Sequence, residues 1–271
     1  MSSVNPVISV ITVVLNNAEG FRQTARSVIN LQYPGIEFIV IDGGSTDGTV
    51  DAIKARSEHI VYWISEPDKG IYDAMNKGLA KATGEWVNFM NAGDVFFDSH
   101  VLSGIFSEDH EGAEMIYGDS IAKYPGFQAL RRARPTEFLW KGMICCHQSM
   151  FIRTDLIKNE GYKSGLHFSA DYEMILRLYN EGKKFLYVPQ TIAIFDTRGI
   201  SNMEMVRSAR SNLEILRSFR ALTKEEKIFH RRFIYKSVLT GWVYKCLPLS
   251  DINSFLKWLY RNQIVRENPR S

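Results

Sequence analysis

Residues 66–94, EPDKGIYDAMNKGLAKATGEWVNFMNAGD, join a turn, a helix with two unlike faces, a buried strand and a polar strand end. A helix is predicted from about Ile71 to Thr83, because apolar and polar residues separate onto opposite sides at helical spacing. The apolar side holds Ile71, Met75, Leu79 and Ala82, and the polar side holds Asp73, Asn76 and Lys77. One face is therefore expected to pack against a core, while the other offers a carboxylate, an amide and an amine.

The two ends of this helix carry further signals. Residues 68–70 (DKG) precede it, where free backbone N–H groups and the positive end of the helix dipole favour an anion such as a diphosphate. Gly84 is expected to close the helix as a C-cap. Trp86 to Met90 predict a short strand, and residues 91–94 (NAGD) form a turn that leaves a carboxylate at the strand's end. An ordinary helix and strand with a polar turn would fit each residue equally well.

Strand-like and helix-like segments also alternate upstream. Strands are predicted over 7–15, 36–41 and 61–64, and helices over about 20–31 and from the 42–49 loop to about 57. Ser45 or Asp47 is expected to cap the second helix. Short connections in this order imply parallel strands with right-handed crossovers. Polar residues follow the strands at Asn16, Asp42, Glu66, Asp68, Asn91 and Asp94. Parallel strands would bring these to one sheet edge, where open α/β sheets bind ligands.

The sequence after residue 114 is less regular. Strands are predicted at 115–119, 146–152 and 185–188, loops at 131–134 and 195–202, and a helix at 170–180. Ser169 is expected to cap this helix, and Asp171 lies in its first turn.

Composition places the chain among globular proteins. Its 271 residues suffice for one large domain, alone or with an extension, and 45% are hydrophobic and 23% charged. No run approaches the ~18 apolar residues that a membrane span needs. The N-terminal segment has no basic region before its apolar run, so it is read as a first strand and not as a signal peptide. Three cysteines without metal-ligand spacing favour a reducing, cytosolic setting.

Positive charge is concentrated in the C-terminal tail. Residues 224–271 hold ten Lys or Arg against four acids, a net +6, whereas the whole chain is +3. Aromatic residues are interleaved with these bases. Such a stretch is typical of a segment that lies on an anionic membrane surface. A helical hairpin that covers the main domain with a solvated basic face fits equally well. No nucleic-acid-reading motif is present, so no nucleic acid partner is expected.

The polar strand ends suit the chemistry of nucleotide sugars. Such an enzyme needs contacts for base and ribose, charge neutralisation for the leaving diphosphate, and a base for the incoming hydroxyl. Asp42 offers acceptors for a nucleobase or ribose, or alternatively forms a turn. Asp94 suits Mg²⁺ or Mn²⁺, which prefer oxygen ligands. Lys69 and Lys77 offer positive charge.

Two residues in the second half of the chain, Asp171 and His147, each allow two interpretations. Asp171 at a helix start is either a general base or an acid favoured there by the helix dipole. His147 either contacts a ligand or acceptor, or is a histidine with its hydrogen bonds satisfied in the core.

Six segments together carry a resemblance to a known family. They read ISVITVVLNN, QYPGIEFIVIDGGSTDGT, EPDKGIYDAMNKGLAKATGEW, FMNAGD, HQSMFIR and FSADYEMILRL, and they cover most of residues 7–202. The sequence resembles the family 2 glycosyltransferases, and among them the short bacterial enzymes that build O-antigen and exopolysaccharide repeat units. The resemblance implies an α/β GT-A fold, with a Rossmann-like, mostly parallel sheet flanked by helices and a helical C-terminal extension. It also implies inverting transfer of a hexose or N-acetylhexosamine from a UDP-sugar to a polyprenyl-diphosphate-linked saccharide.

The resemblance assigns roles by position. Asp171 would be the general base, and Asp94 would hold Mn²⁺ or Mg²⁺ on the diphosphate. Nucleotide-sugar contacts would come from Thr12, Asn16, Asp42, Asp68, Lys69, Gly70, Asp73, Asn76 and Asn91, and acceptor contacts from His147, Gln148 and Arg198. A glycosyltransferase domain is expected over 1–205, with its nucleotide-sugar half ending near 118 and its acceptor half at 119–205, and a helical extension over 206–271. The protein is expected in the cytoplasm at the inner face of the bacterial plasma membrane, with its tail on anionic lipid or on a second copy.

The chain departs from the family in two places. The family's acidic signature commonly reads Asp-x-Asp-Asp, whereas residues 91–94 keep only the last carboxylate. The Gln-x-x-Arg-Trp motif of processive synthases is absent from residues 172–271, so one sugar is expected per encounter. A sugar-nucleotide-binding protein without turnover and a related nucleotidyltransferase are the alternatives. A dinucleotide oxidoreductase is disfavoured, because DGGSTDG lacks G-x-G-x-x-G spacing.

Overall fold

The apolar run after Pro6 forms the middle of a sheet. In the computed structural model, which describes residues 5–108, 110, 112–166, 168–197, 205–246 and 249–265, β1 (Ile8–Val14) is buried along its whole length. It pairs in parallel with β2 (Ile36–Asp42) on one side and β4 (Trp86–Phe89) on the other. β3 (Tyr62–Ser65) pairs in parallel with β2 and forms the sheet edge. The predicted parallel arrangement of these four strands is confirmed.

The second half of the sheet is mainly antiparallel. Its strands are β5 (Val95–Phe96), β6 (Met115–Tyr124), β7 (Phe127–Arg131), β8 (Met150–Arg153), β9 (Phe185–Asp196) and β10 (Ile264–Val265). The main path runs β10-β7-β6-β8-β4-β1-β2-β3, and β9 lies parallel to β6 while it pairs antiparallel with β5. Both β6 and β9 are much longer than the sequence pattern predicted, so Phe195 and Asp196 lie in a strand and not in a loop. Arg131 likewise ends β7.

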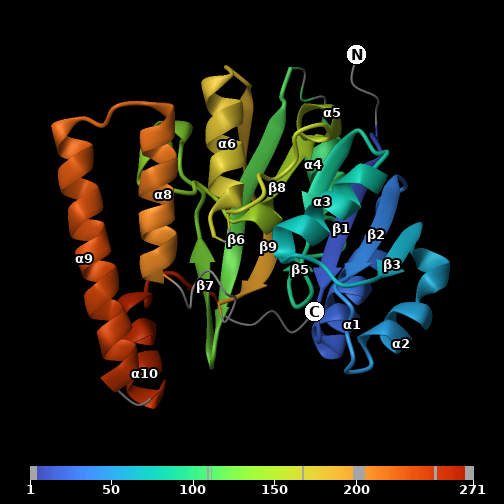
Figure 1. The fold of residues 1–271 in the computed structure, drawn as a ribbon. Coiled ribbons are helices and arrows are strands. Elements are labelled where there is room, and N and C mark those ends of the chain that lie inside the picture. Colours follow the sequence, from blue (N-terminus) through green and yellow to red (C-terminus); the bar gives the residue numbers. More distant parts are fainter. Residues whose placement is uncertain are drawn as a thin grey trace.

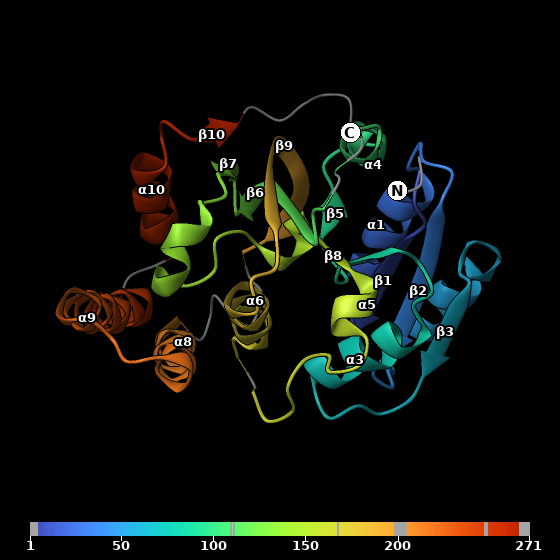
Figure 2. The same cartoon turned by 90° about the horizontal axis from the view of Figure 1, so that it is seen from above.

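Helices cover both faces of the sheet. They are α1 (Ala18–Ile29), α2 (Thr49–Lys54), α3 (Ile71–Lys81), α4 (Val101–Phe106), α5 (Thr154–Ile157), α6 (Ala170–Asn180), α8 (Met205–Phe219), α9 (Lys224–Cys246) and α10 (Leu249–Leu259), with short 3₁₀ turns η1 (Ser57–His59), η2 (Thr136–Lys141) and η3 (His147–Ser149). α1 and α4 pack on one face, and α3, α5 and α6 on the other (Figure 2). The helices α8 to α10 stand at the end of the molecule farthest from β3 (Figure 1). The domain boundary at 205 stays a prediction.

Two predicted helix signals are wrong in detail. α6 spans the predicted residues, but the Ser169 hydroxyl contacts Ser208 and does not cap the helix. α3 ends at Lys81, and Gly84 is not its C-cap. A Cβ on Gly84 would lie 2.7 Å from the Val7 carbonyl oxygen, so glycine is needed here for the close approach of this segment to β1.

A buried carboxylate joins β1, β2 and the segment after α3. Glu37 accepts hydrogen bonds from the Ser9 hydroxyl, from the Thr83 N–H at 2.8 Å and hydroxyl at 2.7 Å, and from the Gly84 N–H at 3.3 Å. Burial alone would raise the pKa of Glu37, but these donors outweigh it and the pKa lies below its usual value. The carboxylate therefore stabilises the fold in its charged form.

We expect Glu37→Gln to lower the free energy of unfolding by about 1.5–3 kcal/mol at neutral pH, because an amide loses charge-assisted hydrogen bonds and turns a donor toward other donors. Since the pKa of Glu37 is lower in the folded chain, its contribution is complete above the unfolded value of about 4.3 and is lost as pH falls through the folded value. Urea unfolding at neutral pH and at about pH 3 tests this, since the gap between the two proteins should shrink on acidification. The exposed Glu58→Gln is the control, and a gap independent of pH would contradict the prediction.

Candidate active site

The carboxyl ends of β1 and β2 are tied together by a polar loop. The Asn16 N–H donates to the Ser45 hydroxyl at 2.7 Å, and the Asn16 side-chain oxygen accepts from the Thr46 N–H at 2.8 Å. Asn16 has φ of +47°, a left-handed conformation that asparagine tolerates better than most residues. The loop over residues 43–49 is therefore fixed against the end of β1, as expected for a ligand-binding edge.

Asp42 organises this loop from inside. Its carboxylate is fully buried and accepts from the Gly44 N–H at 3.1 Å, the Ser45 N–H at 2.9 Å and the Ser65 hydroxyl at 2.6 Å. The predicted turn-forming role is thus realised, and any role toward a nucleobase would depend on the loop that Asp42 holds. A Cβ on Gly43 would lie 2.4 Å from the Asp68 carboxylate, so Asp68 reaches the same loop.

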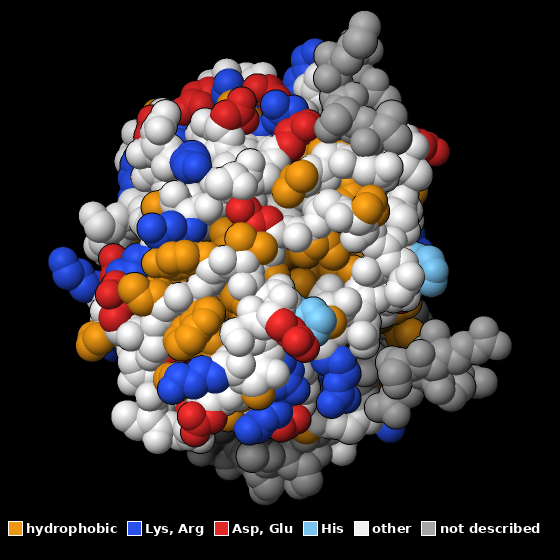
Figure 3. All heavy atoms as spheres, turned by 90° about the vertical axis from the view of Figure 1, so that its right-hand side faces the viewer, with side chains coloured by type: hydrophobic (Ala, Val, Ile, Leu, Met, Phe, Trp, Pro, Cys, Tyr) orange, Lys and Arg blue, Asp and Glu red, His pale blue; other side chains and the backbone are white. Residues whose placement is uncertain are grey.

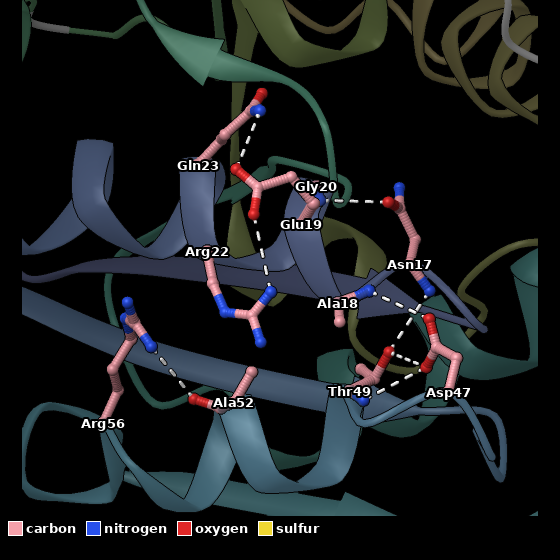
Figure 4. Close-up of polar contacts among 10 residues, drawn as sticks. All are labelled: Asn17, Ala18, Glu19, Gly20, Arg22, Gln23, Asp47, Thr49, Ala52 and Arg56. Atoms are coloured by element: carbon pink, nitrogen blue, oxygen red, sulfur yellow. Dashed lines mark hydrogen bonds and ion pairs between the residues drawn. The ribbon is translucent and has the colours of Figure 1, made fainter.

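The start of α1 is held by the second half of the same loop (Figure 4). The Asp47 carboxylate accepts from the Ala18 N–H at 3.1 Å and from the Thr49 N–H at 3.1 Å. The Asn17 N–H donates to the Thr49 hydroxyl at 3.2 Å. The N-cap of α2 is Gly48, without a side-chain cap hydrogen bond, so the expectation that Ser45 or Asp47 caps this helix is wrong. Asp47 instead accepts from the first N–H groups of α1 and α2.

The segment just before α3 is held by two nearby carboxylates. The Gly70 N–H donates to Asp68 at 2.8 Å, and the Lys69 N–H donates to Asp73 at 3.1 Å. The N–H groups of Lys69 and Gly70, in the segment where an anion was expected, are therefore used inside the chain. Lys77 is similarly engaged, with its ammonium 2.8 Å from Glu66.

Two further expected nucleotide contacts make interior hydrogen bonds in this structure. Thr12 is fully buried, and its hydroxyl donates to the Met90 carbonyl at 2.7 Å. The Asn76 side chain donates to the Tyr162 carbonyl and accepts from the Tyr162 N–H, both at 2.8 Å. Thr12 therefore secures the end of β4, and Asn76 secures the segment before α6 against α3.

Asp94 lies in a buried polar cluster. Its carboxylate accepts from the Gln148 amide and, at 3.1 Å, from the Asp196 N–H. Burial raises the pKa of Asp94, the Gln148 hydrogen bond and the nearby His147 oppose that rise, and the charge of Asp196 adds to it. Gln148, which was expected to contact the acceptor saccharide, therefore donates a hydrogen bond to Asp94 in this structure. Sequence reasoning missed Asp196, because β9 was predicted to end before it.

Asp171 stands in a second cluster that adjoins the first. Its Oδ2 accepts from the Tyr72 hydroxyl at 3.3 Å and lies 3.7 Å from His147 Nδ1. His147 Nε2 is 3.0 Å from the Asn91 amide nitrogen. The Asn91 amide and Nε2 are thus within hydrogen-bond distance, with donor and acceptor roles set by the tautomer of the ring. Asn91, His147, Asp171 and Tyr72 therefore form one continuous network.

The other oxygen of Asp171 is enclosed by the protein. Oδ1 is fully buried, and the equally buried Tyr162 hydroxyl interacts with the Asp171 carboxylate. Burial raises the pKa of the Tyr162 hydroxyl strongly, and the negative charge of Asp171 raises it further. Neither Tyr72 nor Tyr162 was predicted for the site, because an aromatic residue at helical spacing carries no signal that separates it from core. Arg198 lies outside the described residues.

The oxygen atoms near Asp94 fit a hard divalent cation only in part. No cluster of three His, Cys, Asp or Glu side chains suited to a metal occurs in the described part of the chain. The Asn91 side-chain oxygen is buried and has no hydrogen-bond partner among the described residues. The negative charge of Asp196 interacts with Asp94 and raises its pKa. Mg²⁺ and Mn²⁺ commonly take one or two carboxylates and complete their shell with phosphate oxygens. The donor set therefore fits such an ion once a diphosphate is present.

Comparisons with known proteins find a matching family model and relatives that are named glycosyltransferases. Residues 9–182 match the family model "Glycosyl transferase family 2". An uncharacterised glycosyltransferase of Mycobacterium tuberculosis is 34% identical over 208 residues, covering 73% of this chain and 78% of that protein. A "PGL/p-HBAD biosynthesis glycosyltransferase" of Mycobacterium bovis is 30% identical over 181 residues, covering 65% of this chain and 70% of that protein.

Solved structures share the fold at low sequence identity. S. aureus TarS 1-349 in complex with UDP-GlcNAc has a TM-score of 0.61 at 15% identity and covers 90% of this chain and 77% of its own. A mannosyltransferase from Pyrobaculum calidifontis in complex with GDP-Man and Mn²⁺ has a TM-score of 0.61 at 17% identity, covering 95% of this chain and 82% of its own.

Proposed function

Because the chain belongs to glycosyl transferase family 2, we propose that it is an inverting, non-processive enzyme that moves a hexose or N-acetylhexosamine from a UDP-sugar to a polyprenyl-diphosphate-linked saccharide in bacterial surface polysaccharide synthesis. Its fold is that of the GT-A glycosyltransferases, and it is a glycosyltransferase. The observation that carries the finer proposal is the Asp171 carboxylate, whose side chain is 14% exposed and whose Oδ2 lies 3.3 Å from the Tyr72 hydroxyl and 3.7 Å from His147 Nδ1.

Asp171 acts as the general base in this proposal. Tyr72 and His147 contact the carboxylate through Oδ2 and orient it, and the carboxylate receives the proton of the acceptor hydroxyl. The acceptor oxygen displaces the nucleoside diphosphate at the anomeric carbon in one in-line step, which inverts the configuration. A divalent cation bound at Asp94 would neutralise the charge that develops on the leaving diphosphate.

The nucleotide is proposed to bind at the sheet edge formed by the carboxyl ends of β1 and β2. The loop that Asp42 and Asn16 hold supplies the surface for uracil and ribose, and the exposed Lys69 supplies positive charge. A UDP-sugar is proposed because TarS is named in complex with UDP and with UDP-GlcNAc. A GDP-sugar is the competing donor, because the Pyrobaculum enzyme is named with GDP-Man.

The two alternatives predict different products. Incubation with UDP-glucose or UDP-GlcNAc and a lipid extract of bacterial membranes should release UDP and transfer label to lipid. A separate incubation with UTP and a sugar 1-phosphate distinguishes the nucleotidyltransferase, which would form the UDP-sugar and release pyrophosphate. Tight binding of UDP-sugar without release, in every acceptor mixture and with GDP-sugars as well, would indicate a degenerate binding protein. The absence of carboxylates at positions 91 and 93 makes this last test necessary.

A membrane surface is the proposed location of the acceptor. No helix within the described residues is both long and apolar enough to cross a bilayer. Exposed apolar residues line the outer part of the tail instead, with Tyr235 66% and Trp258 58% exposed. Arg231, Tyr235 and Val238 recur on one face of α9, so basic and apolar side chains share that face. This arrangement suits anionic lipid, with rings at the interface and bases near phosphates.

We expect the native protein to bind vesicles that contain anionic lipid, and binding to weaken as salt rises, because the basic face is attracted to lipid phosphates. Replacing Arg231 and Arg232 with Gln should weaken binding by about fivefold per charge, given roughly 1 kcal/mol for each base near the surface. The matched control replaces Arg26 and Lys54, exposed bases of α1 and α2, with Gln. The face of the molecule at the right-hand side of Figure 1 shows acidic and basic side chains interspersed (Figure 3).

Vesicle sedimentation with neutral and anionic lipid measures the effect. Equal binding to both vesicle types, or equal loss in the control, would contradict the electrostatic proposal. Concentration-dependent self-association through the same face would instead assign α9 and α10 to a homodimer.

A further inference from the structure

A buried hydroxyl on α1 lies against the turn that carries Asp94. We propose that Thr24 is a positioning residue: it fixes the 91–94 turn so that Asn91 and Asp94 present their side-chain oxygens to the cation and diphosphate. The inference rests on the proposed function, and it concerns a residue that does not touch the ligand.

The Thr24 hydroxyl uses both its proton and its lone pairs on this turn. It donates to the Asp94 carbonyl at 2.6 Å, with the Asn91 carbonyl at 3.2 Å, and it accepts from the Gly93 N–H at 2.9 Å. The side chain has no exposed surface, so water cannot replace these contacts without a rearrangement. One side chain therefore contacts three backbone groups of the turn, those of Asn91, Gly93 and Asp94.

Other contacts to the turn come from its own backbone and from the end of β1. Gly93 has φ of +105°, a conformation that glycine adopts without cost but does not favour over others. The backbone contributes the Asp94 N–H to Asn91 carbonyl bond at 3.0 Å, and the Ala92 N–H bonds the Val13 carbonyl at 3.1 Å. Thr24 adds the contacts that join the turn to a helix, which is the more rigid support.

α1 also connects the turn with the nucleotide loop. At its first residues Asp47 and Thr49 hold the helix to the 43–49 loop, and Asn17 donates to the Ala92 carbonyl at 3.3 Å. Seven residues after Asn17, Thr24 holds the Asp94 turn. The two surfaces proposed to grip the nucleotide and its diphosphate are thus attached to one rigid helix, which keeps their spacing constant.

Calorimetric titration of UDP, with Mn²⁺ and with chelator, tests the proposal in the full chain. We expect Thr24→Val, which keeps the shape but removes the hydroxyl, to reduce the Mn²⁺-dependent gain in UDP affinity by roughly tenfold, as outer-shell partners of metal ligands commonly do. Thr24→Ser should restore most of the gain, and affinity in chelator should change little. Thr24→Ala serves as a second hydroxyl-free variant if the valine variant does not fold.

The control is Thr154→Val, which removes a buried hydroxyl that has no hydrogen-bond partner among the described residues. Melting temperatures separate folding from positioning, because a merely structural residue would lower stability without changing the ratio of affinities. A native protein that responds to Mn²⁺ and a Thr24→Val variant that responds equally would overturn the Thr24 proposal alone. A native protein that binds UDP without any response to Mn²⁺ would overturn the cation role of Asp94 and, with it, that of Thr24.

Discussion

Asp171→Asn is expected to lower the rate of sugar transfer by about 10²- to 10⁴-fold, the usual contribution of a positioned general base. Affinity for UDP should stay within about twofold, because an effect confined to the transition state leaves ground-state binding intact. The substitution keeps the size of the side chain and the Tyr72 contact at Oδ2. It removes the negative charge that makes the carboxylate a proton acceptor.

The measurement is label transfer to lipid acceptor under saturating donor, with UDP affinity determined in parallel. Asp51→Asn is the matched control, because Asp51 also stands in the first turn of a helix but is exposed on α2. Tyr72→Phe should give a smaller loss than Asp171→Asn, since it removes one contact to Oδ2 and leaves the charge. Transfer retained by Asp171→Asn would remove Asp171 from the mechanism and leave its helix-start position as the explanation for the residue.

The sequence pattern predicted the part of the fold that depends on local periodicity. The run around β1 and the two-faced segment of α3 were recognisable because buried parallel strands and amphipathic helices have distinct patterns. Strand ends then followed from chain order, which is why Asp42 and Asp94 were expected at one edge. The pairing partners of β6 and β9 could not be predicted, because a short stretch of sequence does not show which distant strand will pair with it.

Polarity alone did not separate ligand-facing residues from structural ones. Asn76 and Thr12 are polar residues on expected elements, yet their hydrogen bonds go to Tyr162 and Met90 inside the chain. The reverse holds for Tyr72, whose hydroxyl reaches Asp171 across 99 positions of sequence. Which buried polar group is satisfied, and by whom, depends on tertiary contacts, and these decide what remains available for a ligand.

Asp94→Asn is expected to abolish the Mn²⁺-dependent gain in UDP affinity, because the carboxylate is the only acidic side chain in the 91–94 turn. A neutral amide is a much weaker ligand for a hard cation, and its NH₂ group would oppose the Gln148 amide that now donates to Oδ2. With chelator present, native and variant proteins should bind UDP alike. Asp98→Asn, an exposed acid a few residues later, is the control.

The outcome separates two sources of diphosphate stabilisation. If the gain disappears in the variant, the single carboxylate with phosphate oxygens suffices to hold the ion, and residues 91 and 93 need no acidic side chain. If the native protein shows the gain and the variant keeps it, the ion is held elsewhere, and Asp196, whose charge raises the pKa of Asp94, becomes the next position to replace. If neither protein responds to Mn²⁺, the leaving diphosphate must be neutralised by side chains, and Lys69, which is exposed at the start of α3, becomes the residue to test.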